Sequence, residues 1–219
     1  MNSQLRVKIC CIQSIAEAEL AIACGADALG LVSEMPSGPG VISEARIAEI
    51  AAQVPAGIAT FLLTSKKSVE DVLLQHRRCR TTTIQICDSL QPGDHATLKR
   101  ALPEIEIVQA IHVNNESALH KARALAPHVE ALLLDSGEPD ARMKTLGGTG
   151  RTHNWLISAR ICRKIDKPVY LAGGLNPQNI GEAVETVQPF GVDVCSGVRR
   201  NGQLDQSLLK AFFQNLPGK

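Results

Sequence analysis

The chain has 219 residues, of which 44% are hydrophobic and 21% charged, and its formal net charge is +1. This length and composition suit one substantial core, so we expect a single domain over residues 1–219. The balanced charge and the 3% aromatic content argue against a nucleic-acid partner, and no apolar stretch is long enough for a membrane span or a signal peptide, so we expect a cytoplasmic protein.

Short apolar runs alternate with longer helical patterns along the whole chain, as in repeated βα units. Strands are expected at Arg6–Cys10, Ala28–Val32, Ile58–Leu63, Thr83–Ile86, Glu106–Ile111, Ala131–Leu134, Val169–Ala172 and Val192–Cys195. Helices are expected at Ser14–Cys24, Glu44–Gln53, Val69–Arg77, Ala96–Leu102, Glu116–Leu125, Ile157–Lys164, Pro177–Val187 and Gln206–Asn215. Ser14 with Glu17 forms a capping-box pattern, and Ser43 is a candidate N-cap for the second helix.

Eight strand and helix pairs with short links predict an α/β fold, a single (β/α)8 TIM barrel. The alternative is an open, doubly wound sheet. That fold would normally need fewer units, and a dinucleotide-binding version would carry GxGxxG after its first strand, where this chain has Cys-Cys-Ile-Gln-Ser. The pattern therefore favours the barrel.

The seven cysteines are odd in number and lie mostly inside apolar segments. This arrangement is typical of buried thiols in a reducing compartment rather than of a disulfide framework. Their spacing does not fit a zinc site either, so we predict no metal.

Glycine-rich turns follow the seventh and eighth predicted strands, at Gly173-Gly174 and Ser196-Gly197. In a barrel, functional residues lie at the carboxyl ends of the strands, and the loops after strands seven and eight commonly bind phosphate. Each glycine by itself would be interpreted as a turn residue. Two such turns on adjacent strands predict a phosphate site made of these four residues.

Asp135 ends the apolar sixth strand and Cys10 ends the first, so the two are expected on opposite sides of the barrel mouth. A desolvated carboxyl can have a raised pKa and act as an acid, whereas a free thiol is a poor base at neutral pH unless Lys8 or a helix end lowers its pKa. The alternatives are a helix cap for Asp135 and a small buried hydrophobe for Cys10. Together they suit a proton-transfer reaction on a bound sugar.

A glycine-rich segment, Gly147 to Thr152, lies in the long loop after the sixth strand. It lacks the GxxxxGK[ST] pattern of a nucleotide-binding loop. We predict a lid or substrate loop containing Gly148, Thr149, Gly150 and Arg151, with a solvated linker as the alternative.

From Val7 almost to the C-terminus the sequence resembles the phosphoribosylanthranilate isomerase family of tryptophan biosynthesis. The resemblance rests on ordered motifs: Lys8-Ile9-Cys10, Gly25-Ala26-Asp27-Ala28-Leu29-Gly30, Leu133-Leu134-Asp135, Gly147-Gly148-Thr149-Gly150-Arg151-Thr152 with Trp155, Leu171-Ala172-Gly173-Gly174-Leu175-Asn176-Pro177, and Gly191-Val192-Asp193-Val194-Cys195-Ser196-Gly197-Val198.

The resemblance implies an Amadori rearrangement of N-(5-phosphoribosyl)anthranilate to the aminoketose, an aldose-ketose isomerisation. Cys10 would be the general base that removes the C2′ proton, and Asp135 the general acid that protonates the furanose oxygen. The implied reaction uses no metal, nucleotide or organic cofactor. The implied ligand is a small phosphorylated aminosugar, and the sequence leaves monomer and homodimer open.

The sequence departs from the family on the aglycone side. The segment Ser33 to Ile42 has no Lys, Arg or His where the family usually carries a basic residue for the anthranilate carboxylate. Cys11 replaces the family's glycine after the base, and Ile86-Cys87-Asp88 replaces a motif that often contains histidine. Backbone amides at Ser37, Gly38 and Gly40 are our candidates for holding the carboxylate.

Two alternatives follow from these departures. An isomerase of a different aminosugar phosphate would explain the missing basic residue. A non-catalytic phosphosugar-binding barrel is the other alternative, and its ligand affinity would not change in Cys10→Ala and Asp135→Ala variants.

Overall fold

The computed structural model describes residues 5–137 and 152–218. Eight parallel strands close into a barrel in chain order, with β1 hydrogen-bonded to β8. The strands are β1 Arg6–Ile9, β2 Ala28–Val32, β3 Ala59–Thr64, β4 Thr83–Ile86, β5 Glu106–His112, β6 Ala131–Asp135, β7 Val169–Leu171 and β8 Gly191–Val194. The predicted (β/α)8 fold is confirmed.

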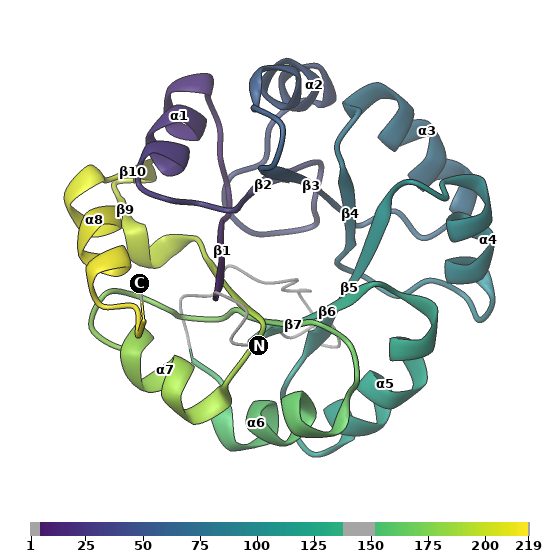
Figure 1. Ribbon diagram of the computed structural model, residues 1–219. Coiled ribbons are helices and arrows are strands. Elements are labelled where there is room, and N and C mark those ends of the chain that lie inside the picture. The colour runs from purple at the N-terminus through teal and green to yellow at the C-terminus, as the bar shows by residue number, and fades with distance from the viewer. Residues whose placement is uncertain (1–4, 138–151, 219) are drawn as a thin grey trace.

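Helices surround the barrel as an outer ring (Figure 1). They are α1 Ile15–Ala23, α2 Glu44–Gln53, α3 Val69–Cys79, α4 Asp94–Ala101, α5 Ser117–Leu125, α6 Trp155–Lys164, α7 Ile180–Val187 and α8 Gln206–Gln214. Two 3-10 turns, η1 Ala126–His128 and η2 Ser196–Val198, and a small hairpin of β9 Arg199–Arg200 and β10 Gln203–Leu204 complete the described elements. The sequence pattern did not predict the hairpin. No described helix is long and apolar enough to cross a membrane.

Strand β6 shows why a barrel strand can be apolar along nearly its whole length. Leu132 and Leu134 pack with helix residues in the layer between barrel and helices, whereas Ala131 and Leu133 lie in the interior cluster that contains Phe61. Both faces of the strand are therefore buried, as parallel barrel strands require.

Local hydrogen bonds explain where the helices begin. Ser43 accepts from the Arg46 amide at 3.2 Å, which confirms the predicted cap of α2. Helix α7 begins at Ile180 rather than at the predicted Pro177. Residues 177–179 form a turn ahead of the helix, in which the Asn176 side chain accepts from the amides of residues 178 and 179.

The capping box of α1 is only half formed. Ser14 accepts from the Glu17 amide at 3.1 Å, as predicted. The Glu17 carboxylate, however, accepts from the Gln13 amide at 3.0 Å and forms an ion pair with Arg199 at 2.8 Å. Arg199 belongs to the hairpin that the sequence did not reveal, so Glu17 connects the start of α1 to the end of the chain.

Closure of the barrel places the two ends of the chain side by side. In the β1–β8 pairing Lys8 lies opposite Asp193, and the Cys10 amide donates to the Val194 carbonyl at 2.8 Å. The carboxyl ends of the first and last strands are therefore neighbours, and the residues that follow them share one side of the barrel mouth.

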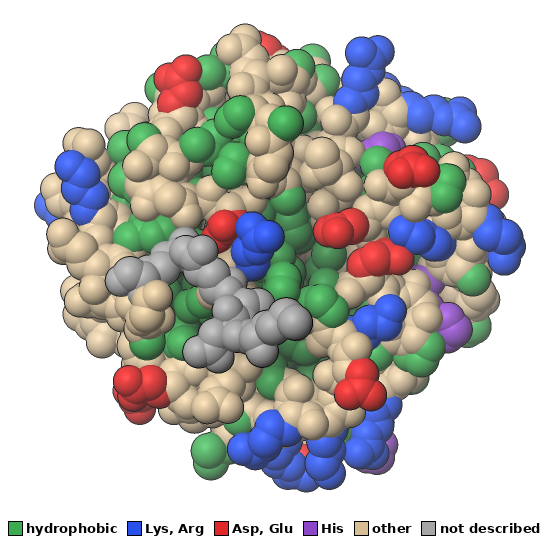
Figure 2. All heavy atoms as spheres, viewed as in Figure 1, with side chains coloured by type: hydrophobic (Ala, Val, Ile, Leu, Met, Phe, Trp, Pro, Cys, Tyr) green, Lys and Arg blue, Asp and Glu red, His purple; other side chains and the backbone are tan. Residues whose placement is uncertain are grey.

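Successive helices run clockwise in Figure 1, so with right-handed crossovers the amino ends of the strands face the viewer. Figure 2 shows that acidic and basic side chains gather around the centre of this face. The ion pair between Arg6 and Asp27, at 3.1 Å, belongs to this end of the barrel. The candidate site lies at the opposite end.

Candidate functional site

A pocket that is partly open to solvent lies at the carboxyl ends of the strands. Most of the predicted site residues line it: Cys10, Ser37, Gly38, Asp135, Gly173, Gly174 and Ser196. These residues come from five strand ends, which is how barrel enzymes assemble their sites. Gly40 and Gly197 do not line the pocket.

Asp135 is the last residue of β6 and is partly buried in the pocket wall. Burial raises the pKa of its carboxyl to about 6, and the Ser136 amide, which donates to it at 2.7 Å, acts in the opposite direction. A carboxyl with such a pKa keeps its proton nearer to neutral pH than an ordinary aspartate does. This property suits the predicted general acid.

Cys10 follows β1 and is buried. Burial raises the pKa of its thiol to about 11, and the neighbouring Lys8 lowers it without overcoming the desolvation. The sequence-based expectation about Lys8 therefore has the right direction, but the net shift is upward. The thiol is the dominant form at neutral pH, and its thiolate would be a strong base.

A buried ion pair lies beneath these two groups. Lys8 Nζ is 2.9 Å from Asp193 Oδ1, and both side chains are almost completely buried. A Cβ placed on Gly30 would lie 2.7 Å from Cys10 Sγ and 3.1 Å from Lys8 Nζ, so the thiol and the ammonium group approach the same point of β2. Burial alone would lower the pKa of Lys8, but the charge of Asp193 raises it above its usual value, so Lys8 stays positively charged.

Sequence reasoning did not assign a role to Asp193. The available signal was a lysine and an aspartate, each flanked by apolar residues, in the first and the last strand. Closing the barrel puts those two positions in register. A pairing across the closure could therefore have been proposed from the barrel prediction alone.

The turn after β7 has the backbone shape expected of an anion site. Gly173 and Gly174 have φ values of 83° and 65°, which side-chain-bearing residues rarely adopt. The side-chain amides of Asn176 and Asn179 donate to the Gly174 carbonyl at 3.3 and 3.0 Å, and they fix the turn. Consecutive amide groups in such a turn can surround an anion.

The turn after β8 packs directly on the turn after β7. A Cβ on Gly197 would lie 2.0 Å from the Leu175 carbonyl oxygen, so only glycine permits this contact. Ser196, one residue earlier, lines the pocket. The structure thus brings the four predicted phosphate residues together, with Gly197 allowing the close approach rather than facing the cavity.

The family profile of N-(5′-phosphoribosyl)anthranilate isomerase matches residues 7–215. The chain belongs to this family. An N-(5′-phosphoribosyl)anthranilate isomerase of Haloferax volcanii is 35% identical over 94% of this chain and 90% of that protein, and a second isomerase, from Methanosarcina mazei, is 32% identical over 92% and 89%.

Solved structures of the isomerase family have the same fold. The enzyme of Thermococcus kodakaraensis has a TM-score of 0.82 and 29% identity, with 99% of this chain and 100% of that chain covered. A phosphoribosyl anthranilate isomerase crystallised with reduced 1-(o-carboxyphenylamino)-1-deoxyribulose 5-phosphate also has a TM-score of 0.82, at 25% identity and the same coverage.

The family membership confirms the activity predicted from the sequence. The chain is an aldose-ketose isomerase of tryptophan biosynthesis that acts on N-(5′-phosphoribosyl)anthranilate.

The loop after β2 carries the residues predicted to hold the anthranilate carboxylate. Ser37 and Gly38 line the pocket, as the carboxylate hypothesis requires. Gly40 does not: a Cβ there would lie 2.5 Å from Cys11 Cβ, so Gly40 packs against Cys11 instead. The loop thus folds back onto Cys11 at Gly40, whose contact with the aglycone stays a prediction.

The predicted lid residues Gly148, Thr149, Gly150 and Arg151 lie outside the described residues. Just after them, His153 is a residue that sequence reasoning missed. A Cβ on Gly173 would lie 3.0 Å from Nδ1 of His153. The other ring nitrogen of His153, Nε2, is 2.7 Å from Ser158 Oγ. Burial lowers the pKa of His153 to about 4, so a neutral imidazole lies beside the turn after β7.

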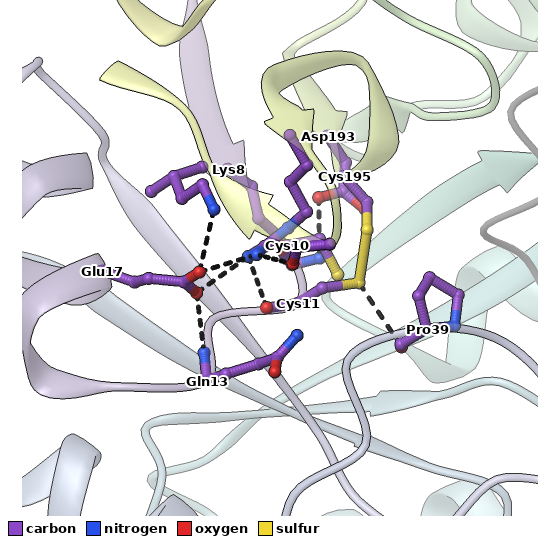
Figure 3. Close-up of a disulfide and its surroundings, with 11 residues drawn as sticks. Lys8, Cys10, Cys11, Gln13, Glu17, Pro39, Asp193 and Cys195 are labelled. Carbon is purple, nitrogen blue, oxygen red and sulfur yellow. Dashed lines mark hydrogen bonds and ion pairs between the residues drawn. A yellow bond between two sulfur atoms is a disulfide. The ribbon is translucent and has the colours of Figure 1, made fainter.

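The expectation of unpaired thiols is wrong for two of the seven cysteines. Cys11 and Cys195 form a disulfide with a Cα–Cα distance of 5.9 Å and a sequence separation of 184 (Figure 3). Free thiols remain at Cys10, Cys24, Cys79, Cys87 and Cys162. The pairing could not be read from spacing, since only closure of β1 on β8 brings the two residues together. Within the described part of the chain, no cluster of three potential ligands could hold a metal.

Proposed function

We propose that Cys10 and Asp135 perform the two proton transfers of the Amadori rearrangement. Asp135, in its protonated form, donates to the furanose ring oxygen as the C1′–O4′ bond breaks, and the anthranilate nitrogen lone pair forms the Schiff base. The Cys10 thiolate then removes the C2′ proton to give the enolamine, which tautomerises to the aminoketose. Both groups are retained in one pocket, at the ends of β6 and β1.

The observation that carries this proposal is the pairing of a carboxyl whose pKa is raised to about 6 with a cysteine of the same cavity. A binding protein would gain nothing from a carboxyl that holds its proton at the cavity wall. General acid and base groups positioned in this way each contribute typically 10²–10⁴-fold to the rate.

Lys8 supports the base. Its ammonium group approaches Cys10 Sγ and is held by Asp193 in a buried ion pair. A fixed positive charge stabilises the thiolate when it forms, and Asp193 keeps the lysine charged and in place. Lys8 is thus a positioning residue that acts through Cys10.

The phosphate is assigned to Gly173, Gly174, Ser196 and Gly197. Two turns in contact, one of them with two consecutive positive φ values, support this assignment. Binding of the non-reacting phosphate holds the sugar between acid and base, so that binding energy is used for orientation. The anthranilate carboxylate is assigned to the backbone of Ser37 and Gly38, which line the same pocket.

The test is an assay with freshly generated phosphoribosylanthranilate that follows the loss of substrate fluorescence. Cys10→Ala and Asp135→Asn should each lower kcat/KM by about 10²-fold or more. Cys24→Ser, a free cysteine outside the pocket, is the matched control and should retain wild-type turnover. Activity within tenfold of wild type in either variant would show that its role is misassigned.

Carboxylate recognition is tested with competing ligands. Anthranilate-type inhibitors should bind more tightly than analogues in which the carboxylate is removed, though less tightly than an arginine contact would allow, since charge-assisted bonds are about twice as strong as neutral ones. Equal affinity for both inhibitors would instead favour an aminosugar phosphate with a different aglycone. Turnover should persist after dialysis against a chelator, because the proposed chemistry uses only protein groups.

A further inference from the structure

The Cys11–Cys195 disulfide lies between two parts of the proposed site. Cys11 directly follows the base Cys10, and Cys195 directly precedes Ser196 in the phosphate turn. Figure 3 shows the bond at the ends of β1 and β8, next to Cys10 and Pro39. Both half-cystines line the pocket. The disulfide therefore joins the strand that carries the base to the turn that is assigned to the phosphate.

The Cys11 end is held firmly by its surroundings. The Arg199 guanidinium donates to the carbonyls of Cys10 and Cys11 and is itself paired with Glu17 at 2.8 Å. On its other side Cys11 packs against Gly40, and it has a left-handed backbone with φ of 63°. Hydrogen bonds and packing thus fix Cys11 without help from the disulfide.

The Cys195 end has weaker support. Cys195 is partly exposed, and the backbone bond that closes the 3-10 turn, from the Val198 amide to the Cys195 carbonyl, is long at 3.4 Å. The contact of Gly197 with Leu175 limits movement toward β7. Attachment to Cys11 restrains the same turn from the side of β1.

We propose that the Cys11–Cys195 disulfide is a positioning element for the substrate phosphate, so that the redox state of this pair sets phosphate affinity. The inference rests on the proposed phosphate site. In the oxidised chain Cys195 holds Ser196 and Gly197 in the binding arrangement. In the reduced chain the turn must be ordered when the phosphate binds, and this cost weakens binding without altering Cys10 or Asp135.

The bond can form by exchange with a diffusible disulfide such as oxidised glutathione. The thiolate of one cysteine attacks a sulfur of the reagent and releases one reagent thiol, which leaves a mixed disulfide. The thiolate of the second cysteine displaces the remaining reagent thiol and closes the Cys11–Cys195 bond. Two protein thiols are oxidised, one reagent disulfide is reduced to two thiols, and the two protons pass to those thiols.

The experiment compares oxidised and dithiothreitol-reduced wild type, with mass spectrometry of the cysteine-containing peptides to verify each state. Reduction should raise the KM for phosphoribosylanthranilate and the Kd for inorganic phosphate by roughly 5- to 30-fold, the size expected for ordering one turn residue, and leave kcat within about twofold. The split between KM and kcat separates phosphate positioning from general loss of structure.

Variants identify the pair responsible. Cys11→Ser and Cys195→Ser should each match the reduced wild type and be insensitive to reductant. Cys24→Ser should respond to reductant as wild type does, because that residue lies away from the pocket.

Three results would overturn the proposal: phosphate Kd and KM equal in the two verified states, a change confined to kcat, or peptides from oxidised protein without the Cys11–Cys195 bond. A redox-dependent phosphate Kd in a protein without isomerase turnover would refute the catalytic assignments and leave this inference standing.

Discussion

The two groups proposed to move protons have pKa values in the reverse of the usual order. The base, Cys10, has a pKa of about 11, and the acid, Asp135, one of about 6. The reactive form, thiolate with carboxylic acid, is therefore a minor species at every pH. Its fraction rises with pH up to the pKa of Asp135, stays level between the two values and falls above the pKa of Cys10.

We therefore expect kcat/KM to be level between about pH 6 and pH 11, with its lower limit set by Asp135 and its upper limit by Cys10. In the Asp135→Asn variant, the residual kcat/KM should rise continuously with pH, with no change of slope near pH 6. The reason is that Cys10 is the only one of the two groups that still titrates in this variant. Steady-state rates across this pH range provide the measurement. A plateau that ends near pH 8.5 would show that the thiol is not desolvated in the working enzyme.

Asp135 also links catalysis to stability. Its folded pKa of about 6 lies above the ordinary value of 3.8, so the folded chain binds the proton more tightly than the unfolded chain does. The stability that this provides is fully present below the unfolded pKa and is lost as pH rises through 6. Ionised Asp135 is therefore destabilising at pH 7.

Asp135→Asn should for this reason raise the free energy of unfolding at pH 7 by about 1–2 kcal/mol, a figure reduced for the partial exposure of the side chain. Urea unfolding at pH 7 and pH 4 measures the effect, which should shrink at the lower pH. A variant that loses both activity and stability at pH 7 would contradict the desolvation argument.

At the scale of elements, sequence patterns identified the strands and most helix starts because these depend on local chemistry. The α2 cap at Ser43 and the apolar runs of the strands need no tertiary information. The strand-end rule located Cys10 and Asp135 for the same reason. Helix α7 begins at Ile180 rather than at Pro177, after a turn over residues 177–179.

The Lys8–Asp193 pair depends on a different level of structure, the register in which β8 closes on β1. Removing one charge leaves the other buried and unpaired, whereas apolar residues at both positions can pack together. We expect Lys8→Met to lower the free energy of unfolding by about 3–5 kcal/mol, and the double variant Lys8→Met/Asp193→Leu to recover most of that loss.

Chemical denaturation of the two single variants and the double variant tests this coupling. The double variant should remain slow as an enzyme despite its recovered stability, since Cys10 loses its neighbouring positive charge. Additive losses in the double variant would show that the two side chains do not act as a pair.

At the scale of the whole molecule, the disulfide and the Arg199–Glu17 ion pair connect residues about 180 positions apart in the sequence. No local pattern reveals such contacts. The prediction of unpaired thiols failed for this reason. The burial and the odd number of the cysteines do not show which two of them meet, because that depends on how the barrel closes. The packing of Gly40 on Cys11 is a contact of the same kind, between the loop after β2 and the residue after β1.

Reduction of Cys11–Cys195 should lower the stability of the whole chain. The bond closes a loop of 184 residues, and a loop of this size predicts a loss of about 2–5 kcal/mol and a fall in Tm of roughly 5–15 °C. Calorimetry with and without reductant measures the change, and Cys11→Ser should unfold at the reduced wild-type temperature under both conditions. An unchanged Tm on verified reduction would refute this expectation.

The pairing of β1 with β8 also has a consequence for synthesis on the ribosome. The proposed base, Cys10, is made long before the residues assigned to the phosphate turn after β8, Ser196 and Gly197. Until β8 has emerged, β1 and β7 each have an unpaired edge open to other chains. The nascent protein is therefore most prone to aggregation just before its active site exists, and a chain terminated before β8 would be both inactive and a target for chaperones and proteases.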